Sequence, residues 1–154
     1  MANNFNVPMI GQANSSCCWL ACYQMLYGWK GRATSEPYGR AKNAGLSTTS
    51  ALYSDQWGKA RNAMGLTSYR VGYLKESFGN LTDILDKCGP MWCAGNFLNG
   101  SPHAIVISGY DPGNQQLRIN DPYEIYKYHS YDYYTYGQWR TLVKELAFAC
   151  QVWY

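Results

Sequence analysis

The stretch CWLACYQMLYGW, residues 18–29, decides the fold, because its apolar residues recur at helical spacing. They are Cys18, Ala21, Cys22, Met25, Leu26 and Trp29. Positions i, i+3, i+4 and i+7 share one face of a helix, so this face is expected to pack against a core. The polar residues Asn14, Ser15 and Ser16 can cap the helix start. We therefore predict a core-facing helix over 18–29.

Outward from this helix, glycines, a proline and a Ser/Thr cluster in residues 31–50 are typical of a long surface connection. A second helix is predicted over about 50–63, with Gly65 beyond its end. A third helix is predicted over about 81–87, closed by Gly89 and the proline that follows. The first half of the chain is therefore expected to be helical.

From residue 91 the pattern changes to β-branched and aromatic segments separated by Gly, Pro and Asn. These segments cover residues 91–97, 103–109, 115–120 and 123–136. They predict an antiparallel sheet. A helix over 138–146 and a terminal strand ending in Trp153 are expected to follow. Helices first and strands second indicate an α+β fold.

The chain has 154 residues, which is the size of one domain, so we expect a single domain over 1–154. Its 27 Leu, Ile, Val and Phe residues make a lean aliphatic core, and 25 aromatic rings are expected to supply the missing packing volume. A net charge of +3 is too small to indicate nucleic acid or membrane binding. We find no apolar run of membrane-spanning length, no signal peptide and no C-x-x-C metal motif.

The chain contains two histidines, and His103 is the better candidate for a catalytic base because it heads a predicted strand. His129 lies in a tyrosine-rich stretch and is expected to be structural. A hairpin at 109–115 would bring residue 120 or 121 to His103. A loop of three or five residues places Asp121 on the face of His103, whereas a loop of four residues places Asn120 there. We favour Asp121, with Asn120 as the alternate, as the group that orients the imidazole.

Cys18 is the best nucleophile candidate, because the positive end of a helix dipole favours a thiolate at the helix start. Cys17 lies one residue earlier, and Cys22 lies one turn further into the core face. Gln12, six residues before Cys18, has a side-chain amide that can donate to a developing oxyanion together with the Cys18 N–H. Nucleophile, base, orienting group and oxyanion donor form a complete set for acyl transfer, and this set needs no metal or cofactor.

The segment QANSSCCW, residues 12–19, resembles the active-site segment of papain-like cysteine peptidases, and the match of Trp19 selects Cys18 over Cys17. The chain as a whole resembles compact bacterial papain-fold effectors and toxin modules. Four motifs carry this likeness in order, namely CWLA at 18–21, GPMW at 89–92, HAIV at 103–106 and Asp121-Pro122. The likeness extends from Val7 to Pro122 and fades beyond it.

This resemblance implies a papain-like fold, in which a central helix with a helical subdomain precedes an antiparallel sheet or half-barrel. It also implies that Cys18 attacks a carbonyl, His103 moves the proton, Asp121 orients His103 and Gln12 helps to bind the oxyanion. The substrate cleft is expected to include Trp19, Cys17 and Pro102. Cys17 stands where such enzymes have a small uncharged residue, and it is interpreted as a serine substitute, a redox partner or half of a vicinal disulfide.

We therefore expect a cysteine endopeptidase that is a secreted bacterial toxin or effector. The absence of a visible signal peptide would fit export by another route, or excision from a longer polypeptide of which this is the C-terminal module. The enzyme would act as a monomer on a protein in the target-cell cytoplasm and could be bound by an immunity protein. The alternatives are a peptidoglycan amidase or endopeptidase, and a deamidase or acyltransferase on the same fold. A binding module that uses the tyrosines after Pro122 is a further, non-enzymatic alternative. With Cys18 assigned to catalysis, five cysteines allow at most two disulfides, which favours a reducing compartment.

Overall fold

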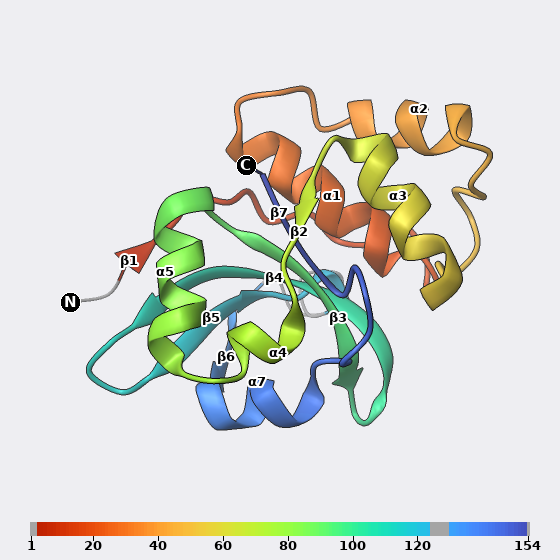
Figure 1. The fold of residues 1–154 in the computed structure, drawn as a ribbon. Coiled ribbons are helices and arrows are strands. Elements are labelled where there is room, and N and C mark those ends of the chain that lie inside the picture. The colour runs from red at the N-terminus through yellow and green to blue at the C-terminus, as the bar shows by residue number, and fades with distance from the viewer. Residues whose placement is uncertain (1–2, 124–129, 154) are drawn as a thin grey trace.

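The structure is a computed structural model that describes residues 3–123 and 130–153 (Figure 1). The helices are α1 (Cys18–Trp29), α2 (Glu36–Asn43), α3 (Trp57–Met64), α4 (Val71–Leu74), α5 (Phe78–Cys88) and α7 (Tyr136–Leu142), with a 3-10 turn at Ser54–Gln56. The strands are β1 (Asn3–Asn4), β2 (Thr67–Ser68), β3 (Met91–Leu98), β4 (Ser101–Asp111), β5 (Gln116–Asn120), β6 (Asp132–Thr135) and β7 (Cys150–Val152). The predictions for Tyr126, Tyr128 and His129 lie outside the described residues.

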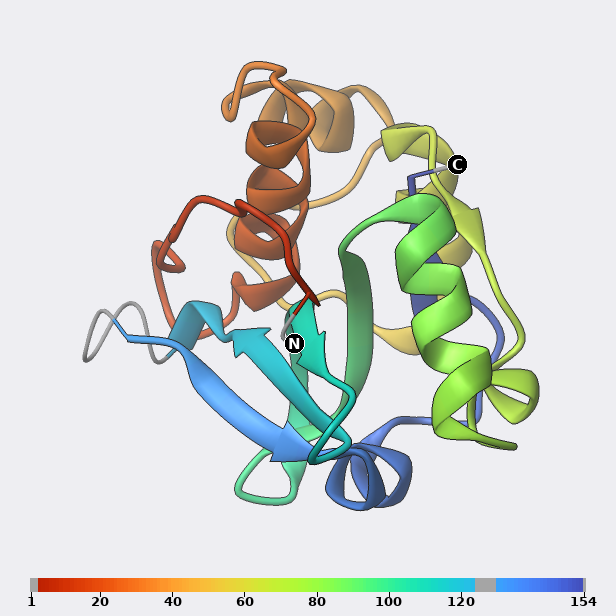
Figure 2. The same ribbon diagram turned by 90° about the vertical axis from the view of Figure 1, so that its left-hand side faces the viewer.

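Helix α1 is confirmed with the predicted bounds, 18–29. It packs against β4, β3 and α2, and its side chains from Trp19 to Leu26 include the largest buried groups of the helical half. Figure 2 shows α1 and α5 on opposite sides of strands β3 and β4. The chain therefore has a helical part that meets a sheet along α1, and the first residue of α1 lies at that junction.

The prediction that residues 31–50 form only a surface connection is wrong, because α2 lies within it. Pro37, the proline counted toward that connection, occupies the first turn of α2, where a missing N–H costs no hydrogen bond. Ala41 of α2 is fully buried and joins the core that α1 and α3 share. Tertiary packing of this one face stabilises a helix that the composition of the segment does not indicate.

The other predicted helices exist with different starts. The helix predicted over 50–63 begins at Trp57 after the 3-10 turn, and Gly65 ends it in the left-handed conformation with φ of 72°. The helix predicted over 81–87 begins earlier, at Phe78, because the Ser77 side chain caps it by accepting a hydrogen bond from the Asn80 N–H at 3.0 Å. The short helix α4 was not predicted.

The predicted antiparallel sheet is confirmed, and with it the α+β class. Its strand order is β2-β7-β3-β4-β5-β6, and β1 pairs in addition with the last residues of β4. The long hairpins β3–β4 and β4–β5 form its centre. The active-site candidates on β4 and after β5 are thereby carried by the most extensively paired strands.

The C-terminal predictions need correction. The strand predicted over 123–136 is reduced to Asp132–Thr135 in the described part of the chain, and Tyr123 is helical. Tyr136 begins α7, because Thr135 and Gln138 form a reciprocal capping box at its start. The helix predicted over 138–146 ends at Leu142, since the next residue turns extended to pair with Gly95. The terminal strand is confirmed and ends at Val152.

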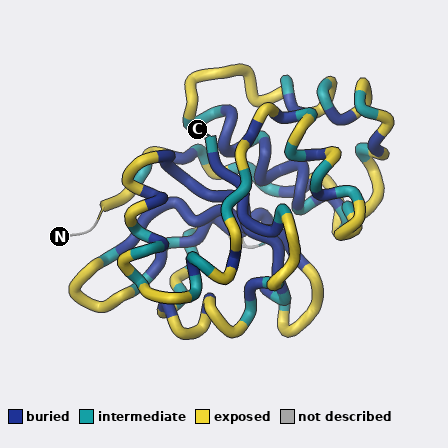
Figure 3. The backbone as a smooth tube through the Cα atoms, viewed as in Figure 1, coloured by how far each residue is buried: buried dark blue, intermediate teal, exposed yellow. Residues whose placement is uncertain are grey.

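Aromatic side chains fill the core, as the lean aliphatic content predicts. The dark blue segments of Figure 3 run through the centre of the molecule, and Trp19, Trp92 and Trp139 are among the largest side chains buried there. Tyr23 stacks on Trp92 with ring centroids 5.1 Å apart, and its hydroxyl donates to Gln151 Oε1 at 2.7 Å. Buried rings thus replace aliphatic volume, and the Tyr23 hydroxyl keeps a hydrogen-bond partner inside the core. No helix in the described ranges is long and apolar enough to cross a membrane.

Candidate active site

Cys18 is the first residue of α1 and the one half-exposed member of the three cysteines at this helix start. Cys17 and Cys22 are buried. The backbone N–H of Ala104 on β4 donates to the Cys18 sulfur at 3.4 Å. Because the first N–H groups of a helix have no partner inside the helix, the Cys18 N–H itself is available to a ligand. The sulfur therefore lies at the helix end that favours an anion and receives a further N–H.

His103 on β4 contacts Asp121, which directly follows β5. His103 Nε2 lies 2.6 Å from Asp121 Oδ1, and both side chains are only 2% exposed. The same carboxylate oxygen accepts the backbone N–H of Tyr123 at 2.9 Å. The Tyr123 ring meets the His103 ring edge-on with centroids 6.3 Å apart. These contacts fix the imidazole plane and leave its other nitrogen, Nδ1, for a second partner.

A β-bulge brings Asp121 to the face of His103. The β4–β5 pairing begins at Asp111 and Gln116, which leaves a four-residue loop, and the sequence argument associates an even loop with Asn120 at His103. The register shifts by one residue between Ile107 and Gly109, so that Val106 pairs with Asn120. Because Ser108 is left unpaired, the residues of β5 that face β4 are shifted by one beyond this point, and Asp121 then shares a face with His103.

The alternate orienting residue, Asn120, does not contact His103. Its Nδ2 donates to the carbonyls of Val7 and Pro8, both at 3.4 Å, and lies 3.7 Å from Met25 Sδ. Asn120 therefore ties the N-terminal segment to the sheet and to α1. The bulge that turns Asp121 toward His103 turns Asn120 away from it.

The electrostatics of the site favour a protonated His103. Burial lowers the pKa of His103, but hydrogen bonds and charge interactions with Asp121 and Cys18 outweigh it and raise this pKa from 6.5 to about 9. The imidazole thus holds its proton at neutral pH while it lies within hydrogen-bonding reach of the Cys18 thiol. An imidazolium beside a thiol at a helix N-terminus is suited to form a thiolate–imidazolium pair, the nucleophilic state of a cysteine hydrolase.

Gln12 is buried beside the segment that carries Asp121. Its backbone N–H donates to the Pro122 carbonyl at 3.3 Å, and its side-chain Nε2 donates to the Asn14 carbonyl at 2.8 Å. Its Oε1 is buried without a hydrogen-bond partner among the described residues. The structure therefore joins Gln12 to Pro122, the residue after Asp121, and one of its two amide hydrogens is already used within the turn before α1.

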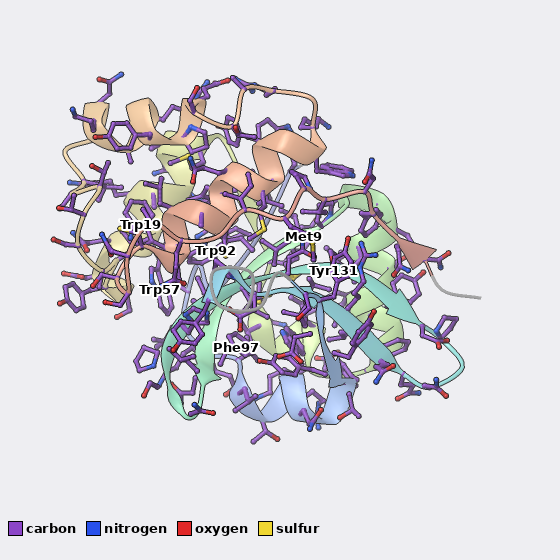
Figure 4. All side chains as sticks on the ribbon, turned by 180° about the vertical axis from the view of Figure 1, so that it is seen from behind. Met9, Trp19, Trp57, Trp92, Phe97 and Tyr131 are labelled. Atoms are coloured by element: carbon purple, nitrogen blue, oxygen red, sulfur yellow. The ribbon has the colours of Figure 1, made fainter. Side chains whose placement is uncertain are left out.

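A small cleft of about 160 Å³ opens beside Cys18 and His103. Its walls are Ser16, Cys18, Trp19, Ala51, Leu52, Tyr53, Trp57, Trp92, Ala94, Gly95, Pro102, His103, Ala104 and Lys144. Figure 4 shows Trp19, Trp57 and Trp92 grouped where the helical part meets β3. Trp19 and Pro102 thus lie where the sequence analysis places them. A larger cavity of about 580 Å³, between Ser68 and Phe148, contains none of the candidate residues.

Cys17 does not line this cleft, which corrects the expectation that it would. It is 2% exposed, and its thiol donates to the Thr48 carbonyl at 3.2 Å. Burial raises the pKa of the Cys17 thiol. Consecutive residues at a helix start point in different directions, so Cys17 faces the loop after α2 while Cys18 faces β4.

Several cleft residues were not identified from the sequence. Leu52, Trp57 and Lys144 come from segments without a recognisable motif, and only their folding onto β3 brings them to Cys18. The orienting contact of Tyr123 was equally missed, although its position two residues after Asp121 could have suggested it. Within the ranges that the structure describes, no group of three or more His, Cys, Asp and Glu residues is arranged to hold a metal ion.

Comparison with known proteins now adds to this geometry. A family model described as "Papain-like cysteine protease AvrRpt2" matches residues 1–138, which extends the likeness beyond Pro122. Among solved structures, the chain is similar to a double glycine motif protease from an AMS/PCAT transporter, solved in complex with the leader peptide. The two chains share 18% identity with a TM-score of 0.56, and the match covers 97% of this chain and 92% of the other, which shows a common fold. A search of curated proteins found no match.

Proposed function

Because the chain belongs to the family of papain-like cysteine proteases described as AvrRpt2, we propose that it is an endopeptidase whose catalytic triad is Cys18, His103 and Asp121. The observation that carries the proposal is the line of contacts from the Cys18 thiol to the His103 ring and from His103 Nε2 to Asp121 Oδ1 at 2.6 Å. A buried carboxylate, an imidazole of raised pKa and a helix-start thiol in this order are the groups that thiol-based acyl transfer requires.

In the proposed reaction, the Cys18 thiolate attacks the carbonyl carbon of a peptide bond, and a C–S bond forms as the oxygen becomes an oxyanion. His103 then gives its proton to the leaving amine as the C–N bond breaks, which leaves a thioester on Cys18. Water attacks the thioester while His103 takes one of the protons of that water. The carboxylic acid departs, and Cys18 and His103 return to their starting protonation. Asp121 holds the imidazole in place throughout.

The oxyanion would be bound by the backbone N–H of Cys18 and by the side chain of Gln12. The N–H of Cys18 belongs to the first turn of α1, where it has no partner inside the helix. Gln12 Nε2 has a second hydrogen beyond the one it donates to the Asn14 carbonyl, and the backbone N–H of Gln12 holds this residue to the Pro122 carbonyl. These two donors support the proposed oxyanion site.

The substrate is proposed to be a protein of a target cell into which this protease is delivered as a bacterial effector or toxin. Support comes from the name of the matching family and from the likeness of the four motifs to compact effector modules. Action in the target-cell cytoplasm, and inhibition by an immunity protein in the producing cell, belong to the same proposal. A role for the tyrosine-rich segment in choosing the substrate would also fit, because Tyr133 is 53% exposed on β6.

The test compares wild-type protein with Cys18→Ala, each incubated with a cytoplasmic extract of a candidate target cell and with purified peptidoglycan sacculi. Mass spectrometry of new protein N-termini should find cleavage sites made by the wild type and not by Cys18→Ala. A gain of 1 Da on a protein without new termini would indicate a deamidase, and release of muropeptides alone would indicate the peptidoglycan enzyme. Either result would overturn the protease proposal.

A further inference from the structure

Lys144 introduces a charge into a cleft that is otherwise mostly apolar. The cleft beside Cys18 is walled by Leu52, Trp92 and Ala94 together with further aromatic and small side chains. Apart from Cys18 and His103, which form the proposed thiolate–imidazolium pair, Lys144 is the charged member of this lining. A substrate side chain that enters the cleft therefore meets apolar walls and one ammonium group.

The backbone holds Lys144 at this place. Its N–H donates to the Ala94 carbonyl at 3.1 Å, and the residue before it, Val143, pairs with Gly95 in an isolated bridge. Gly95 permits this approach, because a Cβ there would lie 2.5 Å from the Leu142 carbonyl oxygen. The segment that follows α7 is thus hydrogen-bonded to β3, and these bonds hold the backbone of Lys144 at the cleft.

The ammonium group of Lys144 is available to a ligand. Within residues 3–123 and 130–153, no carboxylate lies within ion-pair distance of it. The adjacent Glu145 is instead paired with Lys75 at 2.9 Å. Lys144 is half-buried and lines the cleft, so a side chain that enters the cleft comes within reach of it.

The N-terminal part of the chain, which supplies one wall of the cleft, has a net positive charge. Residues 1–64, which include α1 and α3, hold six Lys and Arg against two Asp and Glu, a net charge of +4. The remaining residues hold seven against eight, a net charge of −1. The part of the chain that supplies this wall therefore has no excess of negative charge that would repel an acidic substrate.

From these observations we propose that Lys144 is a specificity-determining residue, which makes the cleft beside Cys18 select substrates with a glutamate or aspartate side chain. This inference rests on the proposed protease function. A glutamate matches the cleft best, because its two methylene groups can lie against the apolar walls while its carboxylate reaches the ammonium group. A glutamine of the same size would leave the charge of Lys144 without a counter-charge.

The experiment uses internally quenched peptides built on a cleavage site that the wild-type protease makes in a protein extract. Glu, Gln, Leu or Lys is placed in turn at each position within four residues of the scissile bond, and kcat/KM is measured. At one position the wild type should prefer Glu over Gln by about tenfold, the effect of one charge-assisted hydrogen bond. Lys144→Met should abolish this preference, and Lys144→Glu should reverse it in favour of Lys.

Lys42→Glu is the matched control, because it makes the same change of net charge on the exposed face of α2, away from the cleft. It should keep the wild-type preference. The inference is overturned if Lys144→Glu leaves the preference at every position unchanged, or if Lys42→Glu changes it as much. In both cases cleavage by the wild type would leave the protease function intact. A wild type that cleaves no protein at all would instead refute the protease function.

Discussion

His103 Nε2 lies 2.6 Å from Asp121 Oδ1 although the loop that joins their strands has the wrong parity for that contact. The four-residue loop alone would turn Asn120 toward His103. The bulge at Ser108 corrects this, and Arg118 holds the bulge by donating to Ser108 Oγ at 3.0 Å and to the Phe5 carbonyl at 2.6 Å. The position of the Asp121 carboxylate, which raises the pKa of His103, thus depends on the one unpaired residue, Ser108.

Asp121→Asn should lower the pKa of His103 from about 9, because the change removes the carboxylate charge while burial continues to lower this pKa. Proteolytic activity at pH 7 should fall by a factor of roughly 10²–10⁴, the usual contribution of a well-placed acid–base pair. NMR titration of labelled histidine measures the pKa, with His129→Gln used to assign the two resonances. An unchanged His103 pKa in the variant would contradict the role given to Asp121.

Cys17→Ala and Cys18→Ala form a matched pair of adjacent thiol deletions. Cys17 is buried with its thiol on the Thr48 carbonyl, and burial raises its pKa, so iodoacetamide should not modify it in the folded protein. Cys17→Ala should therefore keep most of the activity and the rapid alkylation, whereas Cys18→Ala should lose both. Peptide mapping after a short exposure to iodoacetamide identifies the modified residue. Rapid labelling of Cys17 would show that it, too, is reactive.

Stability should depend on pH through His103, and Cys18→Ala isolates this effect from titration of the thiol. In that variant the hydrogen bond and charge of Asp121 are expected to keep the folded-state pKa of His103 above the ordinary 6.5. The stabilisation is complete below about pH 6.5 and is lost as pH rises through the folded-state pKa. The free energy of unfolding should fall by up to about 1.4 kcal/mol per pH unit in that window. Urea unfolding between pH 6 and 8.5 measures it.

The control for this measurement is Cys18→Ala combined with Asp121→Asn. Without the carboxylate, burial dominates and lowers the pKa of His103, so the fall in stability above pH 6.5 should disappear. The buried thiols Cys17 and Cys22 have raised pKa values and stay protonated up to pH 8.5 in both variants. Equal pH slopes in the two proteins would mean that groups other than His103 cause the dependence.

Gln12→Ala should lower kcat by roughly 10²–10³ with little change in KM, because an oxyanion donor acts mainly in the transition state. Asn14→Ala is the control, since the Asn14 side chain supports the same turn by accepting the Ser16 N–H at 2.8 Å but offers no donor to the site in this position. Steady-state kinetics on one peptide substrate, together with thermal unfolding of each variant, separates the loss of an oxyanion donor from a loss of support for the turn. A rise in KM alone would place Gln12 in ground-state binding instead.

The sequence predicts those parts of the site that depend on local patterns. The helical spacing from Cys18 to Trp29 gives α1 its bounds, and the helix start identifies Cys18. His103 follows from the apolar strand that it heads. The contribution of Lys144 could not be predicted in this way, because it depends on a bridge between Val143 and Gly95 from segments nearly fifty residues apart. Likewise, the composition of residues 31–50 hides α2, whose stability comes from packing Ala41 into a shared core.

Deleting Ser108 tests whether this residue is the unpaired one that sets the register at His103. Without it, Gly109–Arg118 and Ile107–Ile119 become consecutive pairs, and Val106 still pairs with Asn120. Asp121 therefore stays on the face of His103, so the variant should keep most of its activity and the raised pKa of His103.

The control deletes Gly109 together with Ser108. No unpaired residue is left to absorb the second loss, so Asp121 should turn to the face opposite His103, and activity should fall by roughly a hundredfold or more. Near-UV circular dichroism confirms that each protein is folded. A folded Ser108 deletion that loses activity as completely as the double deletion would show that the register does not depend on an unpaired Ser108.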